Sequence, residues 1–224
     1  MHHFIPSPHS TAEKKDFGFV LKRFLPDKQT ILVLGYAAGK VALTIQDLEI
    51  CRRLWPGMLI SFFSHHEKQS LIGREVKIEM VLSPHTAEDH LWISHLIELC
   101  LFFTAFNQPW PEVFEHLAQC FTLLKHEEDI APYQLTLKKV YILKFLSLMG
   151  SYSFKSIEPY LKLFQDATSC FIDFTNLQKV NFLKERLHGV SIKKLDNWIL
   201  QALQEHPCFN QLKTPAQMYA RKAL

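Results

Sequence analysis

The stretch TILVLGYAAGKVALTI, residues 30–45, joins two runs of β-branched and apolar residues through a turn of small residues. Two such runs separated by a short turn that contains glycine are typical of a β-hairpin. Most of the chain after residue 87 instead shows the residue spacing of helices. The sequence therefore predicts a small β-module at the front of a largely helical protein.

Three further strands and a short helix are expected around this hairpin. The pattern is clearest in residues 74–82, where Val76, Ile78 and Met80 share one face, as in a strand that is buried on one side. The other strands are expected at residues 17–25 and 57–64, and the helix at residues 47–55. Five strands with a helix between the third and the fourth is the order of an OB-fold barrel, and a five-stranded SH3-like barrel fits almost as well.

The segment SPHTAEDH, residues 83–90, marks the change from strands to helices. Pro84 ends the last strand, and Thr86 can form a capping box with Asp89. Helices are then expected at about residues 87–106, 111–126, 133–149, 156–165, 176–188, 191–205 and 215–222. We predict an α+β fold with a flexible arm at residues 1–15, a small five-stranded OB-like β-barrel at residues 16–83 and an all-α helical domain at residues 84–224.

The composition is that of a folded cytoplasmic protein. Apolar residues make up 48% and charged residues 21% of the chain, which excludes a disordered tail. The most apolar stretch, residues 91–106, contains His95 and Glu98 and is shorter than the ~20 apolar residues of a membrane span. The first residues contain no apolar segment typical of a secretory signal. The five cysteines are scattered without a CxxC pair, which favours reduced thiols and a cytosolic location.

Charge is segregated along the chain. Residues 1–82 carry a net charge of +3, residues 83–132 carry −7, and residues 133–224 carry +7. Two basic regions around an acidic one favour binding of a polyanion or of an acidic partner at the basic ends of the chain. Ordinary solvated surface charge is the alternative interpretation.

Four segments, in this order, are similar to parts of one known family. They are ILVLGYAAGKVALTI (31–45), RRLWPGMLISFFSHHEKQSLIGREVKIE (52–79), HLIELCLFFTAFNQPWPEVFEHLAQCFTLL (95–124) and LTLKKVYILKFLSLMGSY (135–152). Together they resemble the RecO family of DNA recombination mediators over about residues 17–152. The chain departs from that family in having TIQDLEICRR after the hairpin, where a glycine-rich basic segment is usual. It also has only Cys170 where many members hold zinc with four cysteines.

This resemblance implies a protein without catalytic activity of its own. It implies binding of single- and double-stranded DNA, promotion of strand annealing and help in loading the recombinase. As partners it implies a RecR-like mediator and the acidic C-terminal tail of the single-stranded-DNA-binding protein, with no membrane involved. Because the four-cysteine motif is missing, we expect neither zinc nor another cofactor.

Nucleic-acid binding requires cations for the phosphates and flat rings for the bases. In the β-module the candidates are Lys22, Arg23, Lys40, Arg52, Arg53, Trp55, Arg74 and Lys77. The most suggestive group is Arg52 and Arg53 next to Trp55, which we expect near a loop at the end of the short helix. The alternative is that Trp55, Phe62 and Phe63 are core residues, since the two adjacent phenylalanines must point to opposite faces of a strand.

A second cationic surface is expected in the helical part, for a protein partner or for more DNA. Its candidates are Lys138, Lys139, Lys179, Lys184, Arg186, Lys193 and Lys194. An acidic tail that ends in a carboxylate would bind a cation beside an apolar groove. The alternative is that these lysines are simply solvated.

The sequence indicates neither a metal site nor an enzyme. His65 and His66 are adjacent, and Glu112 and His116 lie one helical turn apart, but neither pair has a third ligand at a suitable spacing. The chain also contains no GxSxG, GxxxxGK[ST] or GxGxxG motif. The rival to a DNA-binding mediator is a helical protein–protein adaptor without nucleic-acid binding, in which the β-module is structural packing.

Overall fold

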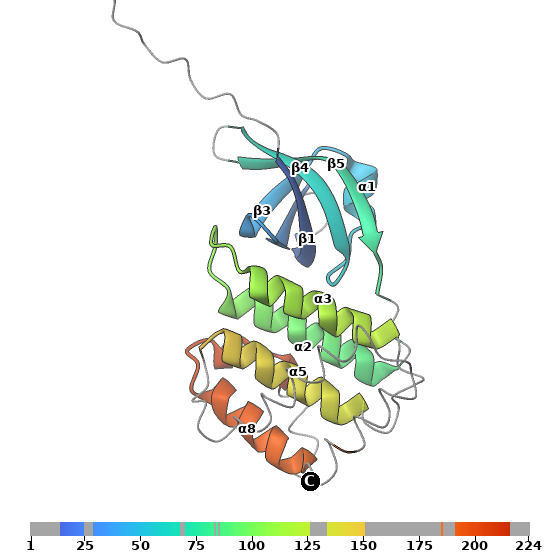
Figure 1. Ribbon diagram of the computed structural model, residues 1–224. Helices are drawn as coiled ribbons and strands as arrows, with labels where there is room; N and C mark the ends of the chain where they lie inside the picture. The colour runs from blue at the N-terminus through green and yellow to red at the C-terminus, as the bar shows by residue number, and fades with distance from the viewer. Residues whose placement is uncertain are drawn as a thin grey trace, which may run out of the picture.

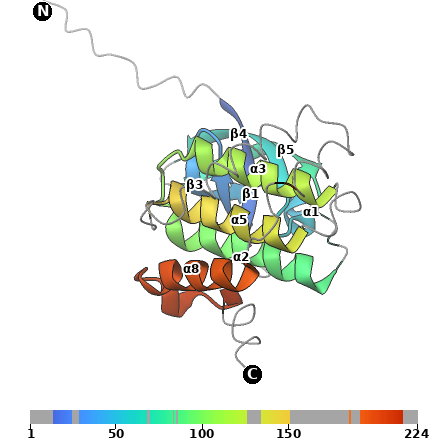
Figure 2. The same ribbon diagram turned by 60° about the horizontal axis from the view of Figure 1, so that its bottom comes forward.

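The computed structural model describes residues 14–24, 29–67, 70–82, 84, 86–125, 134–150, 185 and 191–215. An N-terminal five-stranded β-barrel is followed by helices, which confirms the predicted α+β fold. Figure 1 shows the barrel resting on helices α2 and α3, with α5 and then α8 farther from it. In the turned view of Figure 2, α8 again lies on the far side of the helical layer.

The barrel is closed, with the strand order β1-β2-β3-β5-β4 and with β4 pairing back to β1. Its strands are β1 (Lys14–Arg23), β2 (Thr30–Gly35), β3 (Gly39–Ile45), β4 (Leu59–Glu67) and β5 (Ser70–Met80). Neighbours are antiparallel except for β3 and β5, which pair in parallel. Helix α1 (Leu48–Arg53) connects β3 to β4. This order is consistent with an OB-like fold.

The ends of β4 and β5 differ from the prediction. The sequence predicts strands at residues 57–64 and 74–82, whereas β4 continues to Glu67 and β5 begins at Ser70. The two strands pair over this polar stretch, up to Glu67 opposite Ser70. Ladder hydrogen bonds join backbone groups and need no apolar side chains, so this hairpin extends beyond the apolar runs that predicted it.

The middle of β1 and most of β2 are buried on both faces. Val20 and Val33 point into the barrel and pack there with Leu54 from the end of α1. Phe19 and Leu34, on the opposite faces of the same strands, belong to the hydrophobic cluster of the helices. Because side chains alternate along a strand, β1 and β2 join the barrel interior to the helical core.

The helical region confirms four of the predicted helices. They are α2 (Ala87–Phe103), α3 (Pro111–Lys125), α5 (Gln134–Leu148) and α8 (Ile192–Gln204), followed by the 3-10 helix η3 (Phe209–Gln211). The predicted capping box is present, since the Asp89 N–H donates to Thr86 Oγ1 and the Thr86 N–H donates to Asp89 Oδ2. The helices predicted at residues 156–165 and 176–188 lie outside the described residues, apart from Glu185. The same applies to most of the one predicted at residues 215–222.

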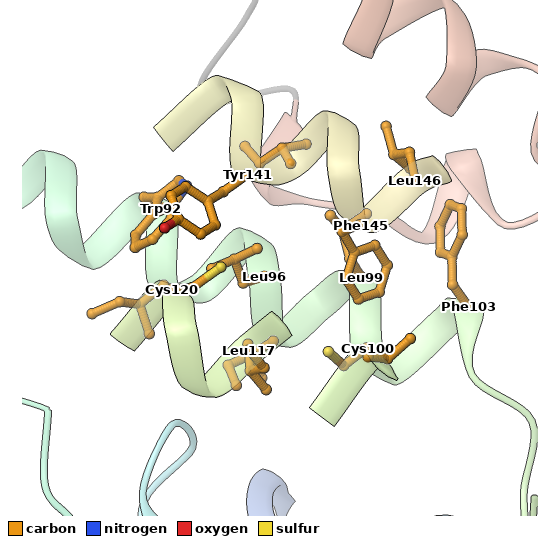
Figure 3. Packing of buried hydrophobic residues seen from close by; sticks show 14 of the residues in the cluster. Trp92, Leu96, Leu99, Cys100, Phe103, Leu117, Cys120, Tyr141, Phe145 and Leu146 are labelled. Atoms are coloured by element: carbon orange, nitrogen blue, oxygen red, sulfur yellow. The ribbon is translucent and has the colours of Figure 1, made fainter. Parts of the chain in front are cut away.

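The helical core lies where α2, α3 and α5 meet. Figure 3 shows Trp92 and Cys100 of α2, Leu117 of α3, and Tyr141 and Phe145 of α5 gathered in one layer, and all five are buried. The Trp92 ring meets the Tyr141 ring edge-on, with centroids 6.4 Å apart. The indole N–H of Trp92 donates to the Lys138 carbonyl at 3.0 Å, so its one polar group is satisfied in the core.

The turn between β2 and β3 fits against both the barrel and the helices. The buried carboxylate of Asp16 accepts hydrogen bonds from the backbone N–H groups of Ala37 and Ala38. On the other side, the Asn107 N–H donates to the Lys40 carbonyl at 2.9 Å. The β2–β3 hairpin is therefore attached to the loop that follows α2.

Candidate nucleic-acid interface

Four of the predicted DNA-binding residues lie together where β1 and α1 end. Arg23 Nη1 donates to the backbone carbonyl of Arg52 at 2.9 Å, and the Arg23 guanidinium lies 5.4 Å from the centroid of the Trp55 ring. Trp55 is 58% exposed, and Arg53, two residues before it in the sequence, is exposed as well. We call Arg23, Arg52, Arg53 and Trp55 the arginine–tryptophan cluster.

The local sequence explains why these side chains face outward. Asp47 caps α1 by accepting the Ile50 N–H at 3.1 Å, and Cys51 and Leu54 point into the barrel. Residues 52 and 53, between them on the helix, are thereby turned toward solvent. Gly57, with φ of 93°, donates its N–H to the Val20 carbonyl at 2.8 Å, which ties the loop after Trp55 to β1.

The electrostatics of the cluster suit an anionic ligand. Arg52 pairs with Glu49 at 3.3 Å, but both side chains are well exposed, and such pairs contribute little to stability. Arg52 can therefore exchange this partner for a phosphate at small cost. Beneath the cluster, burial raises the pKa of the Cys51 thiol, partly opposed by the positive charge of Arg23. Cys51 accordingly remains a neutral thiol near neutral pH.

Other predicted cations of the barrel lie elsewhere. Lys22 is exposed on β1, with its ammonium 5.2 Å from the centroid of the Phe24 ring. Arg74 and Lys77 are exposed on β5, opposite Phe63 and Ser61 of β4. The strand register thus separates Arg74 and Lys77 from the arginine–tryptophan cluster.

Lys40 is not available to a ligand, contrary to the sequence-based expectation. Its side chain is buried, and its ammonium donates to the Leu101 carbonyl at 2.8 Å and lies 4.7 Å from the centroid of the Phe106 ring. Burial lowers the pKa of the Lys40 amine, partly opposed by the nearby thiols of Cys100 and Cys208. Together with Leu32 and Leu34, which pack on the helices, this shows that part of the outer face of β2 and β3 is covered.

The predicted helical surface is also changed by burial. Lys138 forms a buried ion pair with Asp89 of α2, and Lys139 pairs with Asp196 of α8. Both ammonium groups are therefore engaged inside the helical region rather than presented to a partner. The Asp89 carboxyl is buried, which by itself would raise its pKa, but hydrogen bonds from Lys138 and Thr86 outweigh burial and hold the pKa below its usual value.

Two of the remaining helical candidates are exposed. Lys193 and Lys194 lie in the first turn of α8, and the Lys194 ammonium is 4.8 Å from the centroid of the Trp198 ring. Lys179, Lys184 and Arg186 lie outside the described residues.

Sequence reasoning missed Lys15 and Phe17, which lie at the start of β1. Both are exposed, and the Lys15 ammonium is 5.5 Å from the centroid of the Phe17 ring. The opposite orientation expected for the two adjacent phenylalanines is confirmed, since Phe62 fills the barrel and Phe63 lies half-buried on the outside. Lys15 and Phe17 could have been found only from the pairing of β1 with β4. The sequence does not show which strands pair.

No protein-family model matches the chain, and no curated protein matches it. Across the described segments, no helix is long and apolar enough to cross a membrane. Within the same segments, no group of three or more His, Cys, Asp or Glu side chains is placed to hold a metal ion. The fold and the exposed cations are therefore the basis for a functional proposal.

Proposed function

We propose that the chain is a divergent RecO-like mediator that binds single- and double-stranded DNA, promotes annealing and helps to load the recombinase. The observation that carries the proposal is the arginine–tryptophan cluster on a closed OB-like barrel. OB barrels commonly bind oligonucleotides near the loop that joins their first two strands. Arg23 ends β1 and therefore stands at the start of that connection.

The chemistry of the cluster supports a single strand as its principal ligand. Guanidinium groups can bind phosphate through two parallel hydrogen bonds. An exposed tryptophan offers a stacking surface to an unpaired base, worth about 1–3 kcal/mol per base. A base within a duplex is already stacked on its neighbours, so the Trp55 ring adds affinity for unpaired DNA in particular.

A RecR-like mediator and the acidic C-terminal tail of the single-stranded-DNA-binding protein are proposed as protein partners. For the tail, the exposed candidates are Lys193 and Lys194 on α8, with the Trp198 ring beneath Lys194. A cation beside an aromatic ring suits a peptide that ends in a carboxylate. The proposal includes no catalytic step and no cofactor.

Fluorescence anisotropy with a labelled single-stranded oligonucleotide tests the proposal. We expect affinity to fall steeply between low and moderate salt, because bound cations displace counterions from the phosphates. Trp55→Ala should weaken binding by about tenfold, in line with the loss of one stacked base. Arg53→Ala should reduce the slope of log affinity against log salt by about 0.7.

Lys213→Ala is the matched control for Arg53→Ala, since it removes the same charge from an exposed position in the helical region. It should leave both affinity and salt slope unchanged. If the wild-type chain binds no oligonucleotide at any salt, or binds with a flat salt response, DNA binding is excluded. The helical protein–protein adaptor would then be the better description.

A further inference from the structure

The outer face of β1, β4 and β5 carries a second group of cations and rings. In the barrel register, Lys15 lies opposite Phe63, and Phe63 lies opposite Arg74. One step along the strands, Phe17 lies opposite Ser61, and Ser61 lies opposite Lys77. Residues directly opposite each other in antiparallel strands point to the same face. These two rows, Lys15–Phe63–Arg74 and Phe17–Ser61–Lys77, define what we call the three-strand face.

The cations and rings of the three-strand face reach solvent, whereas Ser61, between Phe17 and Lys77, is buried. Lys15, Arg74 and Lys77 are exposed, Phe17 is 41% exposed and Phe63 is half-buried. Neighbouring strands are about 4.8 Å apart, and residues two positions apart on one strand are separated by about 7 Å. The three cations therefore surround the two rings within a patch that spans three strands.

Acidic side chains also lie near both rows of the three-strand face. Glu79, also exposed, accepts a hydrogen bond from the Ser61 hydroxyl and thus lies near Lys77. The row of Lys15, Phe63 and Arg74 contains two cations and a ring. Glu75, the residue after Arg74, is exposed at an irregular point of β5 with φ of 49°. Both cations of β5, Arg74 and Lys77, therefore have an acidic residue near them.

The three-strand face is separate from the arginine–tryptophan cluster. Lys15 and Arg23 are eight positions apart on β1, which corresponds to at most about 26 Å along an extended strand. Between them, Phe19 and Leu21 point toward the helices and are buried. Figure 1 shows β1 running from the side of the barrel remote from the helices to the side next to them. The two surfaces thus lie at opposite ends of this strand.

We propose that the three-strand face binds a second single strand of nucleic acid, so that one chain holds two strands at once. The inference rests on the proposed function, because it assigns the same class of ligand to a second surface. Its basis is charge complementarity together with flat rings, the combination that single-strand binding requires. Because the helices cover the side chains between the two surfaces, binding of two separate nucleic-acid strands is favoured over binding of one continuous strand.

Calorimetric titration with an oligonucleotide of about six nucleotides tests this, since such a length is near the lower end of single-strand site sizes on OB barrels. The wild-type chain should bind two oligonucleotides. Lys15→Glu combined with Phe17→Ala should bind one and keep its sensitivity to Trp55→Ala. Lys77→Glu should also weaken the second binding event. Lys213→Glu, which makes the same charge change in the helical region, should still bind two.

Energy transfer between two non-complementary oligonucleotides, one with a donor dye and one with an acceptor, gives an independent readout. Transfer is expected when strands outnumber protein, and it should disappear in the Lys15→Glu, Phe17→Ala variant and in excess protein. One oligonucleotide per wild-type chain, with no effect of Lys15→Glu, would overturn the second site and leave the proposed function intact. No binding at all would overturn both. Self-association through this face, detected by sedimentation and removed by Phe17→Ala, would also overturn the second site.

Discussion

Gly39 has a positive φ and lies directly against the backbone of the loop after α2. No residue with a side chain would fit both conditions. Its φ is 72°, in the left-handed region, and a Cβ atom there would lie 2.0 Å from the Gln108 carbonyl oxygen. Gly150 has a similar φ of 68°, but a Cβ atom there would have nothing within 4 Å. Replacing each glycine by alanine therefore separates the free-energy cost of the backbone angle from the cost of a steric clash.

We expect Gly39→Ala to destabilise the protein by about 3 kcal/mol or more, because left-handed strain and overpacking against the loop after α2 add together. Gly150→Ala should cost only about 1–2 kcal/mol, from the backbone angle alone. Urea unfolding of both variants measures the difference. Equal losses would show that the loop moves aside without cost.

Two buried histidines should make the protein sensitive to acid. Burial, with a smaller contribution from Lys139, lowers the pKa of His95 to about 3. Burial also lowers the pKa of His116 to about 4, although its ring Nε2 lies 2.8 Å from the Tyr141 carbonyl oxygen. In the unfolded chain a histidine titrates near its ordinary value of about 6.5. The unfolded state therefore binds more protons than the folded state below that pH.

The free energy of unfolding should accordingly fall as pH drops from about 6.5 toward 4, by up to about 1.4 kcal/mol per pH unit for each histidine. Urea unfolding at pH 7.5, 5.5 and 4.5 measures this dependence. His95→Leu should make it shallower than in the wild-type protein. An unchanged slope in that variant would show that His95 is protonated in the folded state.

Helix α5 is held on two sides by adjacent lysines. Lys138 reaches Asp89 of α2, and Lys139 reaches Asp196 of α8, with all four side chains buried or nearly so. Removing one partner of such a pair leaves a charge without compensation in a poorly solvated place. Replacing both partners by apolar residues removes that penalty.

We expect Lys139→Met to destabilise the protein by about 3–5 kcal/mol. The double variant Lys139→Met, Asp196→Leu should recover most of that loss, because no buried charge is left. A double-mutant cycle from urea midpoints measures the coupling. If the double variant is no more stable than Lys139→Met, the pair does not act as a coupled unit.

The elements show which features local sequence determines. Asp47 predicts the start of α1, and Thr86 with Asp89 predicts the start of α2, because capping depends on residues a few positions apart. The common place of Arg52, Arg53 and Trp55 at the end of α1 could be predicted for the same reason, whereas the approach of Arg23 to the Trp55 ring could not. The burial of Lys40, Lys138 and Lys139 could not be predicted, because each ammonium group binds a partner distant in the sequence.

The molecule as a whole shares one hydrophobic cluster between barrel and helices. Phe19 and Leu34 of the barrel belong to the same cluster as Leu96, Phe121 and Leu143 of the helices. The sequence predicts a separate barrel at residues 16–83, but it cannot show which outer face the helices cover. A barrel without helices would expose these side chains to water.

We therefore expect barrel and helices to unfold together. Hydrogen exchange with mass spectrometry at increasing denaturant should give the same opening free energy for peptides from β2 and from α2, as in a single cooperative unit. Both peptides contain fully buried residues, such as Val33 and Leu96, so both report deep positions. A free energy for β2 that is lower by about 2 kcal/mol or more would indicate that the barrel opens independently.

The attachment of the β2–β3 turn to the loop after α2 also has a mechanical consequence. Two hydrogen bonds join these segments: the Asn107 N–H donates to the Lys40 carbonyl, and the Lys40 ammonium donates to the Leu101 carbonyl. They restrict rotation of the barrel relative to the helices. The two halves should tumble in solution with a common rotational correlation time. Tension on a ligand held by the strands would then be transmitted to α2 as torque rather than absorbed by a hinge.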